Sequence, residues 1–234
     1  MVAKTGVHNR ALIPVGGKTM LDCVVSAFLE APVIEQIFVV GDLPASKSYR
    51  TVGDHGGFVE NLYAGLDDSG TAPLVVISTA DVPFLTSEAV EDLVERGREL
   101  DAEIVYPIVP VEACYDRFPG IKRTAVKLRG GRFTGGNLIL ARPEFLLRQR
   151  AHIAAVYGAR KSPLKIARML GIGTVLRFAG SQTIWPGLLN IAGLERTVSR
   201  MVGGKARALI SPFPEIATDI DRVEDLEAIE GLWR

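Results

Sequence analysis

Apolar side chains recur along the chain with two different spacings. In TMLDCVVSAFLEA (19–31), Met20, Val24 and Phe28 lie at four-residue steps, which predicts a helix with one apolar face. The next segment, IEQIFVVGD (34–42), is short, rich in β-branched residues and ends in glycine and aspartate. That composition is typical of a buried strand, so this part of the chain is predicted to form a helix followed by a strand.

The same alternation of helix and strand continues to the end of the chain. Further helices are expected at 57–68, 87–100 and 222–233, and further strands at 73–79, 102–110, 136–141 and 205–211. Strands separated by helices of ten or more residues are typical of a three-layer α/β fold with a mostly parallel sheet. We therefore expect a single domain over residues 1–234, with a mainly helical insertion at about 143–201.

Charge and composition exclude several classes of protein. Lys and Arg together number 27, as do Asp and Glu, so no overall basic field attracts nucleic acid. The basic segment ARKSPLKIAR (159–168) is interpreted as a solvated helix face. The longest apolar runs, such as Leu74–Ile77, are too short to span a membrane, and the N-terminus lacks the pattern of a secretory signal. Cys23 and Cys114 are isolated, so we expect a cytoplasmic protein with neither structural zinc nor disulfides.

Asp81 is the first candidate for metal binding. It lies two residues beyond Thr79, where the predicted strand 73–79 ends, and Pro83 stops that strand from continuing. Ligands of open α/β sheets bind beyond the carboxyl ends of the strands, and Mg²⁺ usually takes one or two protein carboxylates. The position therefore suits a magnesium ligand. The alternative is that Asp81 caps the following turn.

A second acidic segment, ATDID (217–221), lies near the C-terminus. If this segment is extended, the side chains of Asp219 and Asp221 point to the same side. Two like charges held so close are costly unless a cation or a proton intervenes, which favours metal binding. The alternative for Asp221 is that it caps the last helix, with Glu224 in capping-box spacing. We favour the cap for Asp221 and metal binding for Asp219.

A glycine turn near the N-terminus is a candidate for anion binding. In NRALIPVGGKTM (9–20), Arg10 and Lys18 flank the pair Gly16-Gly17, which leads into the first predicted helix. Exposed N–H groups at the start of a helix, together with nearby cations, suit a phosphate. The spacing is not that of a Walker motif, so the signal is weak by itself.

The segment TGGNL (134–138) is a candidate for contact with a ligand. Gly135 and Gly136 permit a ligand to approach the backbone closely, and Asn137 offers both a donor and an acceptor. A plain hairpin turn explains the same glycines.

In their order along the chain, these segments resemble the MobA-like NTP transferases of the glycosyltransferase-A-like nucleotidyltransferase superfamily. The matching segments span nearly the whole chain and are 9–25, 34–42, 75–86, 132–144 and 217–230. The resemblance implies a Rossmann-like nucleotidyltransferase fold. It also implies transfer of a nucleoside monophosphate from an NTP to a small-molecule acceptor bearing a phosphate or hydroxyl group, with release of pyrophosphate.

The resemblance also assigns roles to individual residues. It places Asp81 at the metal-binding aspartate after the central strand, and the DID segment (219–221) where a second metal or phosphate contact lies. It places Lys18 at the lysine of a GGKPM-type segment and Asn61 where such enzymes contact the nucleotide. Mg²⁺ is the implied cofactor. Arg10 and Lys18 would stabilise the triphosphate or the departing pyrophosphate, and the acceptor would lie against the TGGNL segment.

Two features depart from the family pattern. The family opens with a strand and a glycine-rich phosphate loop, whereas residues 1–10 contain neither, so we expect this chain to begin partway through such a unit. Arg10 also stands where lysine is common. Two alternative functions stay open: a metal-dependent glycosyltransferase of the same fold, which releases no pyrophosphate, and a non-catalytic nucleotide-binding module. A dinucleotide-dependent oxidoreductase is disfavoured, because no G-x-G-x-x-G follows a strand.

Overall fold

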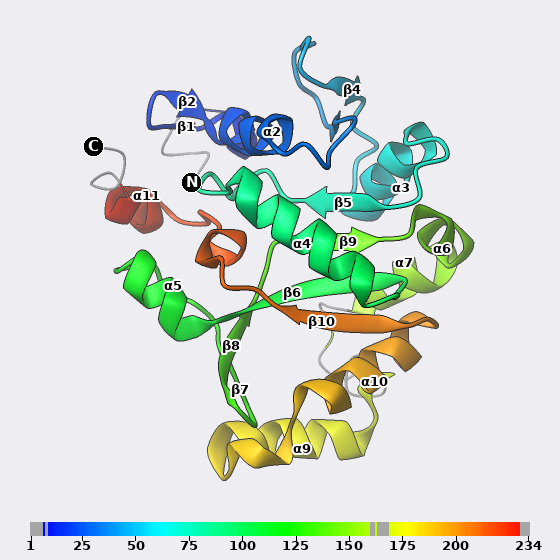
Figure 1. The fold of residues 1–234 in the computed structure, drawn as a ribbon, viewed down its shortest axis with the longest axis vertical. Helices are drawn as coiled ribbons and strands as arrows, with labels where there is room; N and C mark the ends of the chain where they lie inside the picture. The colour runs from blue at the N-terminus through cyan, green and yellow to red at the C-terminus, as the bar shows by residue number, and fades with distance from the viewer. Residues whose placement is uncertain (1–6, 8, 160–161, 163–168, 230–234) are drawn as a thin grey trace.

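The computed structural model describes residues 7, 9–159, 162 and 169–229, and its centre is a mixed β-sheet (Figure 1). Six strands make up this sheet: β5 (Val75–Ser78), β6 (Ile104–Pro110), β7 (Val126–Leu128), β8 (Gly131–Gly135), β9 (Leu138–Ala141) and β10 (Ala206–Ile210). The predicted strands at 73–79, 102–110, 136–141 and 205–211 are confirmed.

The expectation of a mostly parallel sheet is wrong for the described residues. Only β10 runs parallel to its neighbour β6, whereas the pairs β5–β9, β6–β9, β6–β8 and β7–β8 are antiparallel. The reason is the hairpin formed by β7 and β8, which reverses the chain after α5 (Val111–Arg117). Only Gly136 and Asn137 separate β8 from β9, so β9 continues in the direction that the hairpin gave to β8.

A bulge at Gly136 and Asn137 divides one long strand into β8 and β9. Both halves pair with the same strand, since Ile108 lies opposite Gly135 and Val105 lies opposite Leu140. The register differs by two residues between the halves, because the bulged residues have no partner in β6. The Gly136 N–H donates to the Pro107 carbonyl (2.9 Å), whereas the Asn137 N–H turns away from the sheet to the carbonyl of Ile216 (2.9 Å). The bulge therefore aims Asn137 at the segment that precedes the DID sequence.

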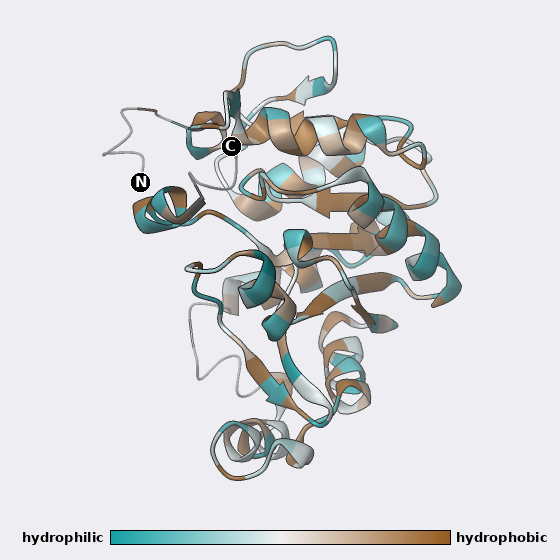
Figure 2. Cartoon of the chain, turned by 60° about the vertical axis from the view of Figure 1, so that its left-hand side comes forward, coloured by the Kyte–Doolittle hydropathy of each residue, from teal (hydrophilic) through white to brown (hydrophobic). Residues whose placement is uncertain are grey.

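Helices cover both faces of the sheet, which confirms the three-layer α/β architecture (Figures 1 and 2). On one face, α2 (Met20–Glu30) and α4 (Ser87–Glu99) pack against Leu138 and Leu140 of β9. On the other face, α3 (Phe58–Asp68) and α6 (Pro143–Arg148) enclose a core with Ala141 and Ile139 of the same strand. Alternate residues of β9 therefore serve opposite cores, as strand geometry dictates.

The predicted helices at 19–31, 57–68 and 87–100 are confirmed, and their boundaries have local causes. Thr19 and Asp22 form a capping box at the start of α2, with the Asp22 N–H donating to Thr19 Oγ1 (3.0 Å). Thr86 caps α4, because its hydroxyl accepts the Ala89 N–H (3.3 Å). The last described helix, α11 (Val223–Ile229), lies within the predicted range 222–233.

Two short strand pairs lie apart from the central sheet. Strands β1 (Pro14–Val15) and β2 (Lys18–Thr19) form a hairpin whose turn is Gly16-Gly17. Both glycines have positive φ (54° and 85°), as a two-residue hairpin turn requires. Strand β3 (Phe38–Val40), predicted within 34–42, pairs in parallel with β4 (Arg50–Val52). Short 3₁₀ segments precede the hairpin, η1 (Arg10–Leu12), and precede the DID sequence, η3 (Pro214–Ala217).

The segment expected as a helical insertion is mainly helical in its described residues. It contains α6, α7 (Arg150–Ala159), α9 (Ile172–Thr183), the 3₁₀ turn η2 (Pro186–Leu188) and α10 (Ile191–Val202). Most of the basic segment 159–168 lies outside the described residues. Among the residues described, no helix is both long enough and apolar enough to cross a bilayer.

Candidate active site

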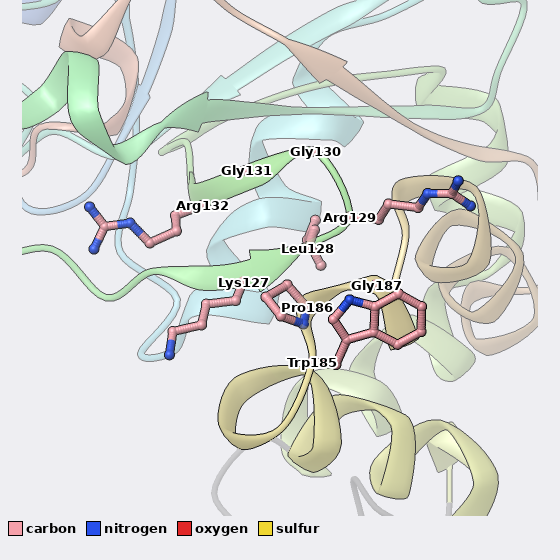
Figure 3. Close-up of a pocket in the computed structure, with 9 residues that line it drawn as sticks. All are labelled: Lys127, Leu128, Arg129, Gly130, Gly131, Arg132, Trp185, Pro186 and Gly187. Carbon is pink, nitrogen blue, oxygen red and sulfur yellow. The ribbon is translucent and has the colours of Figure 1, made fainter.

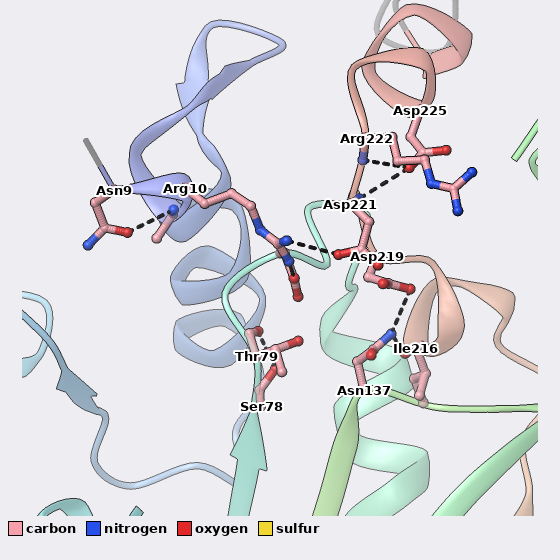
Figure 4. Close-up of polar contacts among 12 residues, drawn as sticks. Asn9, Arg10, Ser78, Thr79, Asn137, Ile216, Asp219, Asp221, Arg222 and Asp225 are labelled. Carbon is pink, nitrogen blue, oxygen red and sulfur yellow. Dashed lines mark hydrogen bonds and ion pairs between the residues drawn. The ribbon is translucent and has the colours of Figure 1, made fainter. Parts of the chain in front are cut away.

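Three carboxylates that are far apart in the sequence converge at one end of the sheet. One oxygen from each of Asp81, Asp219 and Asp221 lies within 4.8 Å of the others. Asp81 follows β5, and the other two follow η3 (Figure 4). The Ile220 N–H donates to the Asp81 carbonyl (2.8 Å), so a main-chain hydrogen bond holds the two acidic segments together.

Arg10 lies between two of these carboxylates. Its Nη1 is 2.9 Å from Asp221 Oδ1 (Figure 4), and its Nη2 forms an ion pair with Asp81 Oδ2. Asn9 fixes the segment that carries Arg10, because its Oδ1 accepts the Ala11 N–H (3.0 Å) at the start of η1. Arg10 thus neutralises two acids that would otherwise repel each other.

Arg123 holds the third carboxylate, Asp219. The two side chains form an ion pair through Arg123 Nη1, and Arg123 Nη2 donates to the Asp219 carbonyl (3.0 Å). Burial acts to raise the pKa of Asp219, but the charge and hydrogen bond of Arg123 outweigh burial and lower that pKa below its usual value. Arg123 is not predictable from the sequence, because it lies in an irregular segment between α5 and β7 without periodicity or motif.

Asn137 completes the contacts of Asp219. Its Nδ2 lies 3.3 Å from Asp219 Oδ1 and 3.4 Å from the Ile216 carbonyl. The main-chain carbonyl of Asn137 accepts the Thr79 N–H (3.3 Å). Asn137 therefore joins the end of β5 to the DID segment (Figure 4). The amide predicted to contact the acceptor is, in this structure, a support for an acidic side chain.

Two buried oxygen atoms at the site have no hydrogen-bond partner. They are Asp81 Oδ1 and Thr79 Oγ1. Buried polar atoms are nearly always satisfied, so an unpaired carboxylate oxygen beside two further carboxylates indicates a place for a ligand. An all-oxygen donor set is the kind that a hard divalent cation prefers, and Asp81, Asp219 and Asp221 therefore fit Mg²⁺.

The glycines of the TGGNL segment are explained by packing. A Cβ atom on Gly136 would lie 2.6 Å from Ile216 Cγ2 and 3.1 Å from the Pro107 carbonyl oxygen. A Cβ atom on Gly135 would lie 2.3 Å from the hydroxyl of Tyr106. A larger residue at either position must displace its neighbours, whether or not an acceptor also approaches there.

Lys18 and Asn61 make their contacts elsewhere. Lys18 is exposed on β2, and its Nζ lies 3.4 Å from the Ser26 hydroxyl of α2. The Asn61 side chain accepts the His55 N–H (2.7 Å) and donates to Asp54 Oδ1 (2.8 Å), so it fixes the loop before α3. The structure brings neither side chain into contact with the three carboxylates, and their roles with the nucleotide stay predictions.

The expectation that Asp221 caps the last helix is wrong. Its carboxylate faces Arg10, and the Asp225 carboxylate accepts the N–H groups of Asp221 (3.2 Å) and Arg222 (2.8 Å) before α11. The side chain of Asp221 therefore takes part in the acidic cluster, and the Asp225 side chain satisfies the main-chain N–H groups that precede α11.

Comparisons with known proteins agree with this fold. The profile of the MobA-like NTP transferase domain matches residues 3–183. A hypothetical transferase from Thermus thermophilus is 36% identical with a TM-score of 0.86, over 96% of this chain and 93% of that one. No curated protein matches the chain.

More distant solved structures share the fold. The 2-C-methyl-D-erythritol 4-phosphate cytidylyltransferase of Thermus thermophilus is 15% identical with a TM-score of 0.59, over 96% of this chain and 93% of that one. A CMP:2-keto-3-deoxy-manno-octonic acid synthetase complexed with CTP is 12% identical with a TM-score of 0.56, over 95% of this chain and 90% of that one.

The fold and the matching family profile together define an α/β protein of the NTP transferase type, and this chain has an acidic cluster at the end of its central sheet. The chain belongs to the MobA-like NTP transferase family. An NTP substrate follows from that membership.

Proposed function

We propose that the protein transfers a nucleoside monophosphate from an NTP to a small acceptor that carries a phosphate or hydroxyl group. The acceptor oxygen forms a bond to the α-phosphorus, the bond from the α-phosphorus to the bridging oxygen breaks, and pyrophosphate leaves with that electron pair. The acceptor gives up its proton to water when it is a hydroxyl group. Chemistry of this kind requires positioning and charge stabilisation more than a protein nucleophile.

One observation carries the proposal. The carboxylates of Asp81, Asp219 and Asp221 lie within 4.8 Å of one another, and Asp81 Oδ1 is buried without a partner. Three carboxylates at this spacing are unfavourable unless cations neutralise them, and Arg10 and Arg123 supply part of that charge. A divalent cation would supply the remainder.

Each residue of the site has a task that follows from its contacts. Asp81 and Asp221 would hold Mg²⁺, because Arg123 and Asn137 already occupy Asp219. Bound Mg²⁺ would neutralise charge on the phosphate oxygens of the NTP. Asp219 would act as a positioning residue that keeps the DID segment against β9. Arg10, which reaches both Asp81 and Asp221, would contact the polyphosphate when a metal replaces it on the carboxylates.

Pyrophosphate release from a panel of NTPs and candidate acceptors tests the proposal, with Mg²⁺ present and after chelation. Asp81→Asn keeps the shape of the side chain but removes its charge, and activity should fall on the order of 10²–10³-fold. Binding of Mn²⁺, followed by electron paramagnetic resonance, should weaken in the same variant. Asp68→Asn is the matched control, because Asp68 is exposed at the end of α3.

Three results would reject the proposal. Full activity of Asp81→Asn would show that Asp81 is not a metal ligand, and undiminished turnover after chelation would show that the reaction needs no metal. Consumption of a nucleotide sugar without pyrophosphate would instead identify a glycosyltransferase.

A further inference from the structure

The helical insertion is rich in basic residues and poor in acidic ones, unlike the rest of the chain. Between Glu144 and Glu195 the sequence contains seven Lys and Arg residues and no Asp or Glu, although the whole chain has 27 of each kind. Arg148, Arg150 and Arg177 lie in described helices of this segment, and the other four cations lie at 160–168, outside the described residues apart from Ser162. A chain without net charge therefore carries one strongly basic segment.

The same segment exposes large apolar side chains. Five of the exposed large hydrophobic residues lie within 176–188: Leu176 (67% exposed), Phe178 (42%), Ile184 (83%), Trp185 (63%) and Leu188 (40%). Single exposed apolar residues are ordinary, but Ile184, Trp185 and Leu188 are three within five positions directly after α9. We call these three residues the apolar patch.

Hydrogen bonds fix the apolar patch to the β7–β8 hairpin. The Lys127 N–H donates to Gln182 Oε1 (2.9 Å), Gln182 Nε2 donates back to the Lys127 carbonyl (3.1 Å), and the Arg129 N–H donates to the Leu189 carbonyl (2.7 Å). Trp185 lies close against the backbone of Gly187, where a Cβ atom would be 2.7 Å from the indole ring. The patch is therefore held in place before any partner arrives.

Cations surround the apolar patch on two sides. A hollow of about 730 Å³ beside Trp185 is lined by Lys127, Arg129 and Arg132 (Figure 3). A smaller hollow of about 70 Å³ next to Leu188 is lined by Arg177 and Arg196. Within the described part of the chain, the guanidinium groups of Arg129 and Arg177 have no ion-pair partner.

We propose that the apolar patch and its surrounding cations dock on a bilayer surface that contains anionic lipid. Lys and Arg side chains near such a surface are attracted to the lipid headgroups, while exposed aliphatic and indole side chains enter the boundary of the acyl layer. A second copy of the chain is a poor partner, because it would bring two basic segments together. Nucleic acid would leave Leu176 and Ile184 without apolar contact.

Co-sedimentation with vesicles tests the proposal. The protein should sediment with vesicles of phosphatidylcholine mixed with phosphatidylglycerol, and poorly with phosphatidylcholine alone, and added salt should weaken the binding. Arg129→Gln and Arg177→Gln should each lower the partition coefficient about fivefold, which corresponds to about 1 kcal/mol for each cation. Ile184→Ser and Trp185→Ser should lower it on the order of tenfold. In a Trp233→Phe background, Trp185 fluorescence should shift to shorter wavelength with anionic vesicles.

Matched controls distinguish binding through this surface from nonspecific adsorption to vesicles. Leu29→Ser removes an exposed leucine (55% exposed) of α2, and Arg98→Gln removes an exposed arginine at the end of α4; both should bind vesicles as the unaltered protein does. Asp81→Asn should also bind vesicles as the unaltered protein does. Vesicle binding can therefore be tested even if the proposed nucleotidyl transfer is not observed. Equal loss in the controls, preference for DNA over vesicles, or self-association that depends on Ile184 would overturn the proposal.

Discussion

The main-chain N–H of Ile220 donates a hydrogen bond to the main-chain carbonyl of Asp81 (2.8 Å), across 139 positions of sequence. Because the bond joins backbone atoms, it places the acidic segments independently of their side chains. The residues on either side of Ile220 are Asp219 and Asp221, so this single contact sets the position of both beside Asp81. Substitution of Asp81 or Asp221 should therefore leave the other acidic segment in place, whereas Asp219 also holds the DID segment through Arg123 and Asn137.

Arg10→Gln should make the protein more dependent on divalent cations. The variant removes the cation between Asp81 and Asp221, so the carboxylates repel each other when no metal is bound. We expect Tm to fall by about 2–4 °C without Mg²⁺, for a loss of about 1 kcal/mol. Mg²⁺ should then raise Tm by more than it does in the unaltered protein.

Arg142→Gln is the control for that measurement. It breaks an exposed ion pair with Asp101, and such pairs contribute little to stability. An equal response of Tm to Mg²⁺ in Arg10→Gln and the unaltered protein would contradict the placement of Arg10 on the metal site.

Arg123→Gln should be strongly destabilising. The Arg123 side chain is only 8% exposed, and its loss leaves Asp219 charged without its main partner. We expect the free energy of unfolding in urea to fall by about 3 kcal/mol. Adding Asp219→Asn to this variant should restore part of the loss, because the unpaired charge is then gone. If the two substitutions are simply additive, the ion pair does not hold the site.

Gly136→Ala should impair both stability and activity. The new Cβ would lie 2.6 Å from Ile216 Cγ2, so η3 and the DID segment behind it must shift. We expect a loss of about 1–3 kcal/mol, which is the usual cost of overpacking, together with weaker binding of Mn²⁺. Gly158→Ala is the control, because nothing lies within 4 Å of its Cβ position in α7. The Gly158→Ala substitution should leave the free energy of unfolding unchanged or raise it slightly.

Cys114 should make stability fall at high pH. Burial raises the pKa of this thiol from 9.0 to about 11, so the folded state holds the proton more tightly than the unfolded state does. The resulting stability is fully present below pH 9 and is lost as the pH rises toward 11. Denaturant unfolding at several pH values should show this loss, and Cys114→Ala should reduce it. Rapid alkylation of Cys114 in the folded protein at neutral pH would contradict this account.

The sequence is sufficient to predict the three acidic residues but not how they are held. Asp81 follows an apolar strand, and Asp219 and Asp221 have strand spacing; both are local signals. Arg123 has no such signal, because its role depends on a contact with Asp219 across 96 positions. Arg10 is expected at a phosphate, and the structure places it on the carboxylates, since charge alone does not tell which anion a cation will meet.

The predicted elements are largely confirmed, whereas the direction of the strands is not predictable from periodicity. An apolar run such as 136–141 indicates a strand but contains no information about which neighbour it joins. Only Arg129 and Gly130 separate β7 from β8, and Gly131 begins β8, so the sequence there indicates only a glycine-rich turn. The hairpin that the two strands form reverses the chain and makes the sheet mostly antiparallel.

The basic insertion between Glu144 and Glu195 has an electrostatic consequence for the molecule as a whole. With seven of the 27 basic residues and no acidic ones in that stretch, the remainder of the chain must be acidic by the same amount. Such a division of charge would make a neutral protein, with an isoelectric point near 6.8, an electric dipole. An external electric field exerts almost no net force on such a molecule but does exert a torque on it. Near any charged surface, the protein would be oriented before it makes contact.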